Sequence, residues 1–418
     1  MKEGKTMQKI KYDKIDKITE NFDALYGEAT SFQIERYSKL LESFKKTFNE
    51  KSGYFVSSPG RVEVCGNHVD HNGGKVISTA ISLDSLAVFL PTDDQKVTII
   101  SEGYGKIEVD LDKPCKKESS SKALVYGVSE GLKNRGYKTG GFNAVLTSNV
   151  AGGAGISSSA SFEVLVAEIF NFLYNDSKID CATKAIVSQY AENEYFLKPC
   201  GLLDQTAISF GGLNRLNFGK VGEIKVDKID NDLKDYSLVL INTGGSHENL
   251  TDEYASIPRE MFAVAKEMGV SRLIEKSKEE FLSLAPLFID KVSDRAINRT
   301  MHFYEENERV DRAYESLKKD DLKTFIECLN LSGVSSAVKL QNCYVSGSTD
   351  QPIIRAISIA SSFNFDGAVR VHGGGFAGTV LNVVKNENLG EFLRNIYNFY
   401  DKKSVYVLKV RSCGAIVL

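Results

Sequence analysis

The sequence predicts an α+β protein built from two lobes. Segments with strand-like patterns come first, long helical segments follow, and a second mixture of strands and helices closes the chain, an order typical of α+β architecture. With 418 residues, 42% of them hydrophobic and 26% charged, the chain has the composition of a globular protein with more than one domain-sized unit. We divide it into an N-terminal lobe, 1–220, and a C-terminal lobe, 221–418, although the sequence does not mark this boundary sharply.

The N-terminal half is predicted to begin with a helix and to continue mainly as strands. Residues 14–48 have helical character, and SGYFVSSPGRVEVCG (52–66) is interpreted as two strands around a turn that contains proline and glycine. Alternating apolar residues predict further strands through about residue 112. The remaining elements of this half are three helices and a strand pair, expected at 122–135, 160–174, 180–196 and 213–227.

The C-terminal half begins with a predicted strand at YSLVLINT and is then mostly helical from about 252 to 340. Three apolar segments near the end predict strands, and a segment at 389–400 predicts a helix among them. These strands are expected at GAVRVHG, GTVLNVV and SVYVLKV.

Charge and cysteine content narrow the classes of function. The net charge is −3 and no block of basic residues stands out, so we expect no nucleic-acid partner. Seven scattered cysteines without a C-x-x-C pair favour a reducing compartment over a disulfide framework or a zinc site. The N-terminus has no apolar core like that of a signal peptide, and no stretch approaches the roughly 20 apolar residues that span a bilayer. We therefore expect a cytoplasmic protein without a membrane partner.

The stretch AGGAGISSSA (151–160) places small, flexible residues directly before an apolar run with helical spacing. Serine is a good residue to open a helix, and a helix N-terminus offers unpaired N–H groups and a partial positive charge to a phosphate. Glycines let the backbone approach such a ligand closely. The candidate phosphate ligands are Gly153, Ala154, Gly155, Ile156, Ser157, Ser158 and Ser159. An ordinary glycine-rich linker with a serine cap is the alternative.

Two further stretches carry polar residues in unusual settings. The turn SSPGRVEVCGNHVDHNGG (57–74) suits a hydroxyl-rich ligand, because each buried polar group needs a partner; a polar surface turn is the alternative. Its polar side chains include Arg61, Asn67, His68 and Asp70. Asp204 lies among apolar residues, an unusual place for a carboxylate unless something charged faces it, and a helix-capping aspartate is the alternative.

The stretch RVHGGGFAGT (370–379) satisfies the pattern G-x-G-x-x-G, which is a weak signal by itself. Too little chain remains after it for the further βαβ units that a dinucleotide fold requires. The chain has neither a G-x-x-x-x-G-K-[ST] loop nor the H-R-D signature of protein kinases. If the chain binds ATP, neither of those two architectures holds it.

Together these motifs resemble those of galactokinases, within the larger family of galacto-, homoserine, mevalonate and phosphomevalonate kinases. The resemblance rests on PGRVEVCGNHVDHNGG, GAGISSSAS and VHGGGFAGT, and it extends to AENEYFLKPCGLLDQ, INTGGSHENLTDEY and HFYEENERV. It covers roughly residues 20–418. It implies a two-lobed small-molecule kinase fold, with an N-terminal lobe like domain 2 of ribosomal protein S5, a ferredoxin-like C-terminal lobe, and the active site in the cleft between the lobes.

The resemblance also implies roles for individual residues. Asp204 matches the catalytic aspartate beside the anomeric hydroxyl of the sugar, and Arg61 matches the arginine next to it and to the transferring phosphate. Residues 153–159 match the loop that holds the phosphates of ATP, and Ser159 and Glu192 match positions associated with Mg²⁺. The implied sugar-binding residues are Asn67, His68, Val69, Asp70, Tyr254 and Gly374, the last within the loop 373–378 that closes the site.

We therefore expect a galactokinase that transfers phosphate from ATP, with Mg²⁺, to galactose and releases galactose 1-phosphate. Phosphoryl transfer needs positioning and charge stabilisation, which arginine donors supply, and a carboxylate can accept the hydroxyl proton. Serine and glutamate oxygens are suitable hard ligands for Mg²⁺. Ser101 aligns loosely with a nucleotide contact. Family members are often monomeric, so we expect a monomer.

One departure from the family pattern bears on the substrate. The sugar turn of galactokinases reads G-E-H-T-D-Y and here reads GNHVDH, so Asn67 replaces the glutamate that holds the C6 hydroxyl of the sugar. Because Asn67 and His68 could donate to a carboxylate, galacturonate or another uronic acid is an alternative substrate. A non-catalytic sensor that binds sugar and nucleotide is a second alternative. The departures at Ala151, Gly333 and Ala377 do not touch the expected chemistry.

Overall fold

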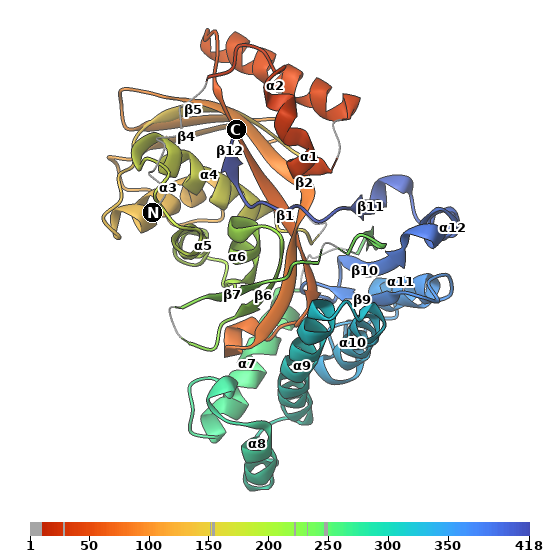
Figure 1. Cartoon of the computed structure of the whole chain (residues 1–418). Helices are drawn as coiled ribbons and strands as arrows, with labels where there is room; N and C mark the ends of the chain where they lie inside the picture. The colour runs from red at the N-terminus through yellow and green to blue at the C-terminus, as the bar shows by residue number, and fades with distance from the viewer. Residues whose placement is uncertain are drawn as a thin grey trace.

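Two β-sheets, each packed against helices, organise the chain (Figure 1). The computed structural model describes residues 11–27, 30–150, 152, 155–220, 223–231, 233–245 and 250–418. One sheet has eight strands and is built mainly from the first half of the chain, and the other has four strands from the second half. The predicted α+β class is confirmed.

The eight-stranded sheet has the order β12-β1-β2-β5-β3-β4, and β6 and β7 extend it beside β2. Among the described strands of this sheet, every neighbouring pair except β3–β5 is antiparallel. The strands predicted through about residue 112 and the pair near 213–227 are confirmed. The strands are β1 (Tyr54–Cys65), β2 (Lys75–Pro91), β3 (Lys96–Ser101), β4 (Gly105–Asp110), β5 (Phe142–Ser148), β6 (Leu213–Asn217), β7 (Lys225–Lys228) and β12 (Ile416–Val417).

β1 is a single strand, so the prediction of two strands around a turn is wrong. Pro59 and Gly60 lie at a shift in the pairing of β1 with β2, a position at which a strand tolerates both residue types. A Cβ on Gly60 would lie 2.9 Å from the carbonyl oxygen of Ile156, so glycine permits a close approach of another segment. The irregularity brings Arg61 beside that segment, and the Arg61 N–H donates to the Ile156 carbonyl at 3.3 Å.

The three helices predicted between 122 and 196 are confirmed, and the last of them ends in a π-helical turn, Ala191–Tyr195. The predicted helix at 14–48 is interrupted at Gly27, which has a left-handed φ of 77° and ends α1. The helices of this half are α1 (Phe22–Tyr26), α2 (Ser31–Phe48), α3 (Ser121–Lys133), α4 (Ser158–Tyr174), α5 (Cys181–Tyr190) and α6 (Leu203–Phe210).

The four-stranded sheet has the order β11-β8-β10-β9 and is antiparallel throughout its described strands. Its strands are β8 (Tyr236–Asn242), β9 (Ala368–His372), β10 (Thr379–Lys385) and β11 (Val405–Leu408), as predicted. The helices of this half are α7 (Thr251–Glu267), α8 (Lys278–Leu284), α9 (Asp294–Lys318), α10 (Leu322–Ser335), α11 (Pro352–Ser361) and α12 (Asn386–Ile396). α11 is a short helix that is rich in β-branched isoleucine, and it was not predicted from the sequence.

The two sheets meet where β1 passes β9. The Arg370 Nη1 donates to the carbonyl oxygen of Val64 at 2.6 Å, and the Glu63 N–H donates to the His372 Nε2 at 3.1 Å. The glycine-rich loop between β9 and β10 therefore lies beside the turn that follows β1. The lobe boundary near residue 220 stays a prediction. Two strands that follow it in the sequence, β7 and β12, belong to the eight-stranded sheet.

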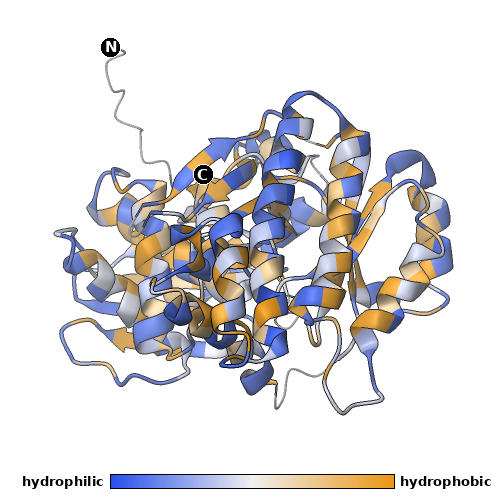
Figure 2. Ribbon diagram, turned by 90° about the horizontal axis from the view of Figure 1, so that it is seen from below, coloured by the Kyte–Doolittle hydropathy of each residue, from blue (hydrophilic) through white to orange (hydrophobic). Residues whose placement is uncertain are grey.

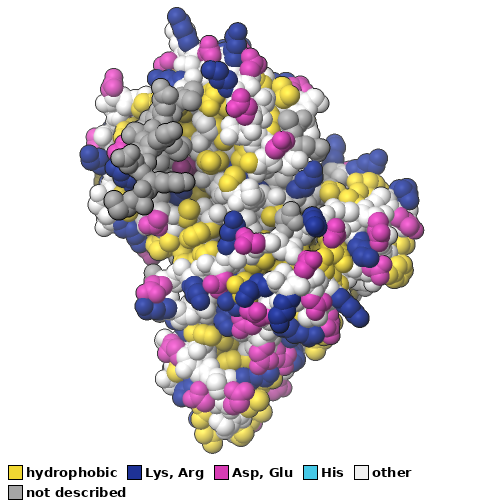
Figure 3. Space-filling model, in the orientation of Figure 1, with side chains coloured by type: hydrophobic (Ala, Val, Ile, Leu, Met, Phe, Trp, Pro, Cys, Tyr) yellow, Lys and Arg dark blue, Asp and Glu magenta, His cyan; other side chains and the backbone are white. Residues whose placement is uncertain are grey.

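The amphipathic helices and the small net charge of −3 fit a globular protein. Figure 2 shows helices on which hydrophobic and hydrophilic residues alternate, as expected for amphipathic helices that cover a sheet. On the face drawn in Figure 3, basic and acidic side chains are interspersed. Within the described ranges, no helix has both the length and the apolar character needed to cross a membrane. Each of the seven cysteines lies in these ranges and is a free thiol.

Candidate active site

Three segments that are far apart in the sequence meet at Arg61, Gly155 and Asp204. Its Nε and Nη2 donate to the two carboxylate oxygens of Asp204 at 2.8 and 2.9 Å, a bidentate ion pair. Its Nη1 donates to the carbonyl oxygen of Gly155 at 2.6 Å. Arg61 is 6% exposed, whereas the side chain of Asp204, in the first turn of α6, is 33% exposed. The pair is thus anchored on the arginine side and open on the carboxylate side.

The predicted phosphate loop runs directly into α4, which begins at Ser158. Gly153 and Ala154 lie outside the described residues. Gly155 has a left-handed φ of 67°, and a Cβ there would lie 2.8 Å from the Thr379 Oγ1, so the position needs glycine. Ile156 is fully buried and anchors the loop in the core.

The hydroxyl of Ser157 donates to the Asp204 Oδ2 and makes no capping hydrogen bond to α4. This differs from α2, α3, α5 and α9, whose N-cap side chains accept from the first turn of their helices. The first turn of α4 is therefore not occupied by its own N-cap side chain, which suits a helix end that receives a phosphate.

Ser159 and Glu192, the two positions predicted to be associated with Mg²⁺, are adjacent. The Ser159 Oγ donates to the Glu192 Oε1 at 3.0 Å. Glu192 is 2% exposed and also accepts from the Lys198 Nζ at 2.9 Å and from the Gln205 Nε2 at 2.8 Å. Lys198 and Gln205 were not predicted as site residues, although both lie in the stretch that carries Asp204.

Glu163 is a second carboxylate close to this cluster, and it too was not predicted as a site residue. It is fully buried on α4 and accepts from the Gln205 Nε2 at 3.2 Å, while its Oε1 has no hydrogen-bond partner among the described residues. Burial, and then the neighbouring charge of Glu192, raise the pKa of Glu163 well above its usual value. Its position in the sequence could have indicated a buried carboxylate, because Glu163 is a charged residue within the apolar run of the predicted helix.

The predicted sugar turn lies next to both glycine-bearing loops. His68 has a left-handed φ of 55°, and its Nε2 lies 3.0 Å from the carbonyl oxygen of Gly374. Burial lowers the pKa of His68 to about 4, so the ring is neutral at pH 7. Because a carbonyl only accepts, Nε2 carries the proton, and Nδ1 is then an acceptor.

Asp70 faces the segment that leads to Asp204. A Cβ on Gly201 would lie 1.8 Å from the Asp70 Oδ2, so the two segments are in close contact. Burial acts to raise the pKa of Asp70, but the hydrogen bond and charge of His71 outweigh it and lower the pKa. Val69 is fully buried beside Leu203 in the core and supports the turn from behind.

The glycine-rich loop closes over the turn from the C-terminal half. The Tyr254 hydroxyl, on α7, donates to the carbonyl oxygen of Gly375 at 3.0 Å, and a Cβ on Gly374 would lie 2.6 Å from the Tyr254 ring. Burial raises the pKa of Tyr254 to about 12. Ser101 is the last residue of β3, which forms a hairpin with β4. Tyr104 lies in the turn of this hairpin, and a Cβ on Gly152 would lie 3.4 Å from the Tyr104 hydroxyl. The hairpin therefore borders the phosphate loop.

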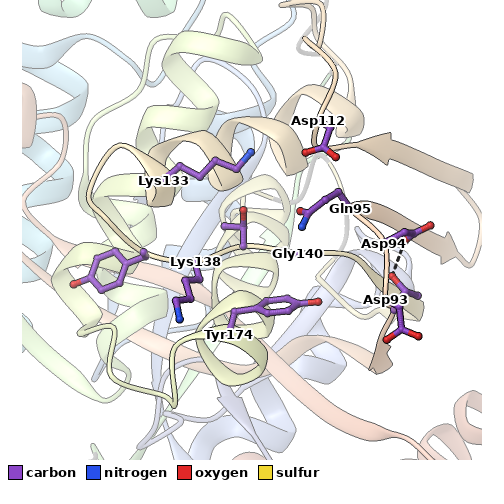
Figure 4. A pocket seen from close by; sticks show the side chains of 11 residues that line it. Asp93, Asp94, Gln95, Asp112, Lys133, Lys138, Gly140 and Tyr174 are labelled. Atoms are coloured by element: carbon purple, nitrogen blue, oxygen red, sulfur yellow. Dashed lines mark hydrogen bonds between the residues drawn. The ribbon is translucent and has the colours of Figure 1, made fainter.

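Two cavities lie outside this cluster. One of about 710 Å³ borders the glycine-rich loop at Phe376 and Ala377. The other, about 520 Å³, lies between the β2–β3 turn and the C-terminal ends of α3 and α4; its lining includes Asp94, Lys133 and Tyr174 and none of the predicted site residues (Figure 4). Among the described residues, no group of three or more His, Cys, Asp or Glu is arranged to hold a metal ion.

Known proteins match the chain over most of its length. The galactose-binding signature of galactokinases matches residues 42–91, and the N-terminal domain of GHMP kinases matches residues 123–212. The galactokinase of Clostridium tetani is 31% identical over 374 residues, which cover 87% of this chain and 92% of the relative. The galactokinase of Lactococcus lactis subsp. lactis is 28% identical over 394 residues, which cover 90% of this chain and 95% of the relative.

Solved structures agree with these matches. The crystal structure of Lactococcus lactis galactokinase complexed with galactose superposes with a TM-score of 0.80 at 26% identity, covering 92% of this chain and 100% of that one. A mevalonate kinase shares the fold, with a TM-score of 0.60 at 17% identity, covering 85% of this chain and 98% of that one. The predicted kinase fold is thereby confirmed. Because a relative above 30% identity matches most of both chains, this chain belongs to the galactokinase family and is a sugar kinase.

Proposed function

We propose that the chain transfers the γ-phosphoryl group of ATP to the anomeric hydroxyl of galactose. The observation that carries the proposal is the bidentate Arg61–Asp204 pair, which lies directly against Gly155 and Ser157 of the phosphate loop. A carboxylate next to both a guanidinium and a phosphate-binding helix end is suited to a hydroxyl that attacks a phosphate.

Each residue has a defined part in the step. The sugar O–H bond breaks and its proton passes to Asp204, the oxygen forms a bond to the γ-phosphorus, and the bond from that phosphorus to the bridging oxygen breaks to leave ADP. Asp204 is the base and orients the hydroxyl, and Arg61 holds Asp204 and donates to the charge that develops on the phosphoryl oxygens. The first turn of α4 binds the phosphates that are not transferred and that stay with ADP.

Ser159 and Glu192 fit Mg²⁺, because a hydroxyl and a carboxylate oxygen are hard ligands of the kind it prefers. The nucleotide phosphates and water would supply its remaining ligands. When bound, it would neutralise phosphate charge. Ser159 and Glu192 would hold it, and Gln205 and Lys198 keep the Glu192 carboxylate in place by donating to its two oxygens.

The turn favours a neutral sugar over a uronic acid. Both N–H groups of the Asn67 amide are bound within the protein, to Glu63 and to the Gly373 carbonyl. His68 donates to the Gly374 carbonyl and so presents an acceptor, and Asp70 is a carboxylate with a lowered pKa. Two acceptors suit sugar hydroxyls, which can donate, and oppose a substrate carboxylate, which cannot.

A coupled assay of ADP release across galactose, glucose and galacturonate tests the choice of sugar. We expect the highest kcat/KM with galactose and little turnover of galacturonate. A preference for galacturonate would contradict the proposed selectivity of the turn for a neutral sugar. No turnover with any sugar would support a non-catalytic sensor instead.

Asp204→Asn tests the chemistry. We expect kcat to fall by about 10²–10⁴-fold, because the amide cannot take the proton, while calorimetry shows ATP binding nearly unchanged. Asp227→Asn is a matched control, since Asp227 also pairs with an arginine, Arg215, on β6 at 2.7 Å, and it should leave kcat unchanged. Full activity of the Asp204 variant would remove this residue from its proposed role.

We further propose that the enzyme acts as a monomer in the cytoplasm. The free thiols support a reducing compartment such as the cytoplasm. Light scattering of the purified protein would test the oligomeric state.

A further inference from the structure

Asn67 lies where four segments of the fold meet. Its backbone N–H lies 3.4 Å from the Glu306 Oε1 and donates to it, and its backbone carbonyl accepts from the His302 Nε2 at 2.9 Å. Glu306 and His302 are both on α9, and both are fully buried. The backbone on either side of the Asn67 side chain is therefore fixed by a helix of the C-terminal half.

The side-chain amide of Asn67 is bound on all sides. Its Nδ2 donates to the Glu63 Oε1 at 2.9 Å and to the carbonyl oxygen of Gly373 at 2.7 Å. Its Oδ1 accepts from the Asn342 Nδ2 at 2.8 Å and from the Ser336 Oγ at 3.4 Å. An amide offers two donor hydrogens and two acceptor positions, so this side chain, with 0% exposure, has none left for a ligand.

These bonds fasten the glycine-rich loop to the sugar turn. Asn67 holds the Gly373 carbonyl, while the next carbonyl, of Gly374, receives the His68 Nε2 at 3.0 Å and the Asn342 Nδ2 at 3.3 Å. A Cβ on Gly373 would lie 3.8 Å from the Gly155 carbonyl, so the fastened loop also reaches the phosphate loop.

We propose that Asn67 is a positioning residue, which fixes the closing loop 373–378 and the ring of His68, and that it does not contact the C6 substituent of the sugar. The proposal rests on the proposed function. It differs from the role that the family resemblance implies, in which this position binds the sugar.

Glu63 explains why an amide stands at position 67. The carboxylate of Glu63 is 4% exposed and pairs with the Arg370 Nη2 at 3.1 Å. A carboxylate at 67 would face two acceptors, the Glu63 Oε1 and the Gly373 carbonyl, and buried acceptors without donors are costly. An amide donates to both.

The decisive experiment compares Asn67→Ala with the wild type on galactose and on 6-deoxygalactose, which lacks the C6 hydroxyl. If Asn67 positions the loop, kcat/KM falls by the same factor, about 10–100-fold, with both sugars, because misplaced groups slow any substrate. If Asn67 binds C6, the loss appears with galactose alone, and the proposal is wrong.

Two variants keep the test decisive if Asn67→Ala is poorly folded. Asn342→Ala removes a donor to both the Asn67 Oδ1 and the Gly374 carbonyl without changing residue 67, and should lower kcat/KM for both sugars alike. Asn364→Ala is the matched control, a buried asparagine that donates to the Ala368 and Val383 carbonyls, and should leave both values unchanged. An Asn342 effect confined to galactose, or none at all, overturns the proposal.

A double-mutant cycle measures the Glu63–Asn67 contact. Asn67→Asp with Glu63→Gln reverses the carboxylate and the amide, so we expect the double variant to lose less kcat/KM than the product of the single losses. Strictly multiplicative losses would contradict the coupling. Failure of the proposed function is seen separately, as a wild type that phosphorylates neither sugar.

Discussion

Position 201 has no room for a side chain, and this single residue links two parts of the candidate site. A Cβ there would lie 1.8 Å from the Asp70 Oδ2 and 2.7 Å from its Cγ. The atoms it meets are the free end of a side chain, so the carboxylate can turn away while the backbone stays in place. Gly201 therefore determines where Asp70 points.

We predict that Gly201→Ala raises the KM for galactose by about 10-fold or more, since the displaced Asp70 no longer meets the sugar, with little change in the KM for ATP. Steady-state kinetics with each substrate varied in turn would measure this. Gly390→Ala is the control, because a Cβ there meets only the Arg394 Nη1 at 3.7 Å. Equal changes in both KM values would contradict a local effect on Asp70.

At the scale of elements, α9 holds the turn after β1 from the opposite lobe. Its Glu306 accepts from the Gly66 N–H at 3.0 Å and from the Arg309 Nε at 2.7 Å, and the hydroxyl of Ser332 also donates to it. These charges and hydrogen bonds offset the cost of burial and lower the pKa of Glu306 to about 2. One helix thus carries a buried charge whose partners lie in the turn after β1, on α10 and on α9 itself.

We predict that Glu306→Ala lowers the free energy of unfolding by about 3–5 kcal/mol, because Arg309 and two turn N–H groups lose their buried partner. Urea denaturation would measure the loss. Glu308→Ala, on the exposed face of the same helix, where Glu308 is 60% exposed and pairs with Lys278, should change stability by less than about 0.5 kcal/mol. Similar losses in both variants would contradict the role given to Glu306.

At the scale of the whole molecule, buried neutral histidines make stability depend on pH. Burial lowers the pKa of His68 to about 4, and it also lowers the pKa of His302 and of His372. Below about pH 6.5 the unfolded histidines bind protons that the folded ones do not, and for His68 this difference persists down to about pH 4. The free energy of unfolding therefore falls as pH decreases through this range.

We predict that each such histidine contributes up to about 1.4 kcal/mol per pH unit to this slope. Urea denaturation at pH 7, 6 and 5 would measure it, and His302→Gln, although less stable overall, should show a shallower slope than the wild type. Glu63 and Glu163, whose pKa values burial raises, act with the opposite sign in both proteins, so the difference in slope reports on His302 together with Glu306, whose pKa it helps to lower. Parallel slopes would contradict the prediction.

The sequence alone determined most of the elements and the chemical character of the site, because these depend on local pattern: apolar periodicity for helices and strands, and glycines and serines before a helix for a phosphate loop. It failed where a local signal was overruled by packing. Pro59 and Gly60 signal a turn, but pairing with β2 keeps them within one strand. Lys198, Glu163 and Glu306 were missed because nothing near them in the sequence shows which carboxylate or N–H they meet.

Only the tertiary structure decided how the polar residues are used. The sequence presents Asn67 as a free amide that could bind a sugar, whereas the fold surrounds it with Glu63, Gly373 and Asn342 and leaves it no open donor. The physical reason is that hydrogen bonds are short and directional, so which groups remain for a ligand depends on atoms brought together from distant parts of the chain. Composition and spacing indicate which groups can bind a ligand. The fold determines which of these groups have no partner within the protein and remain available to a ligand.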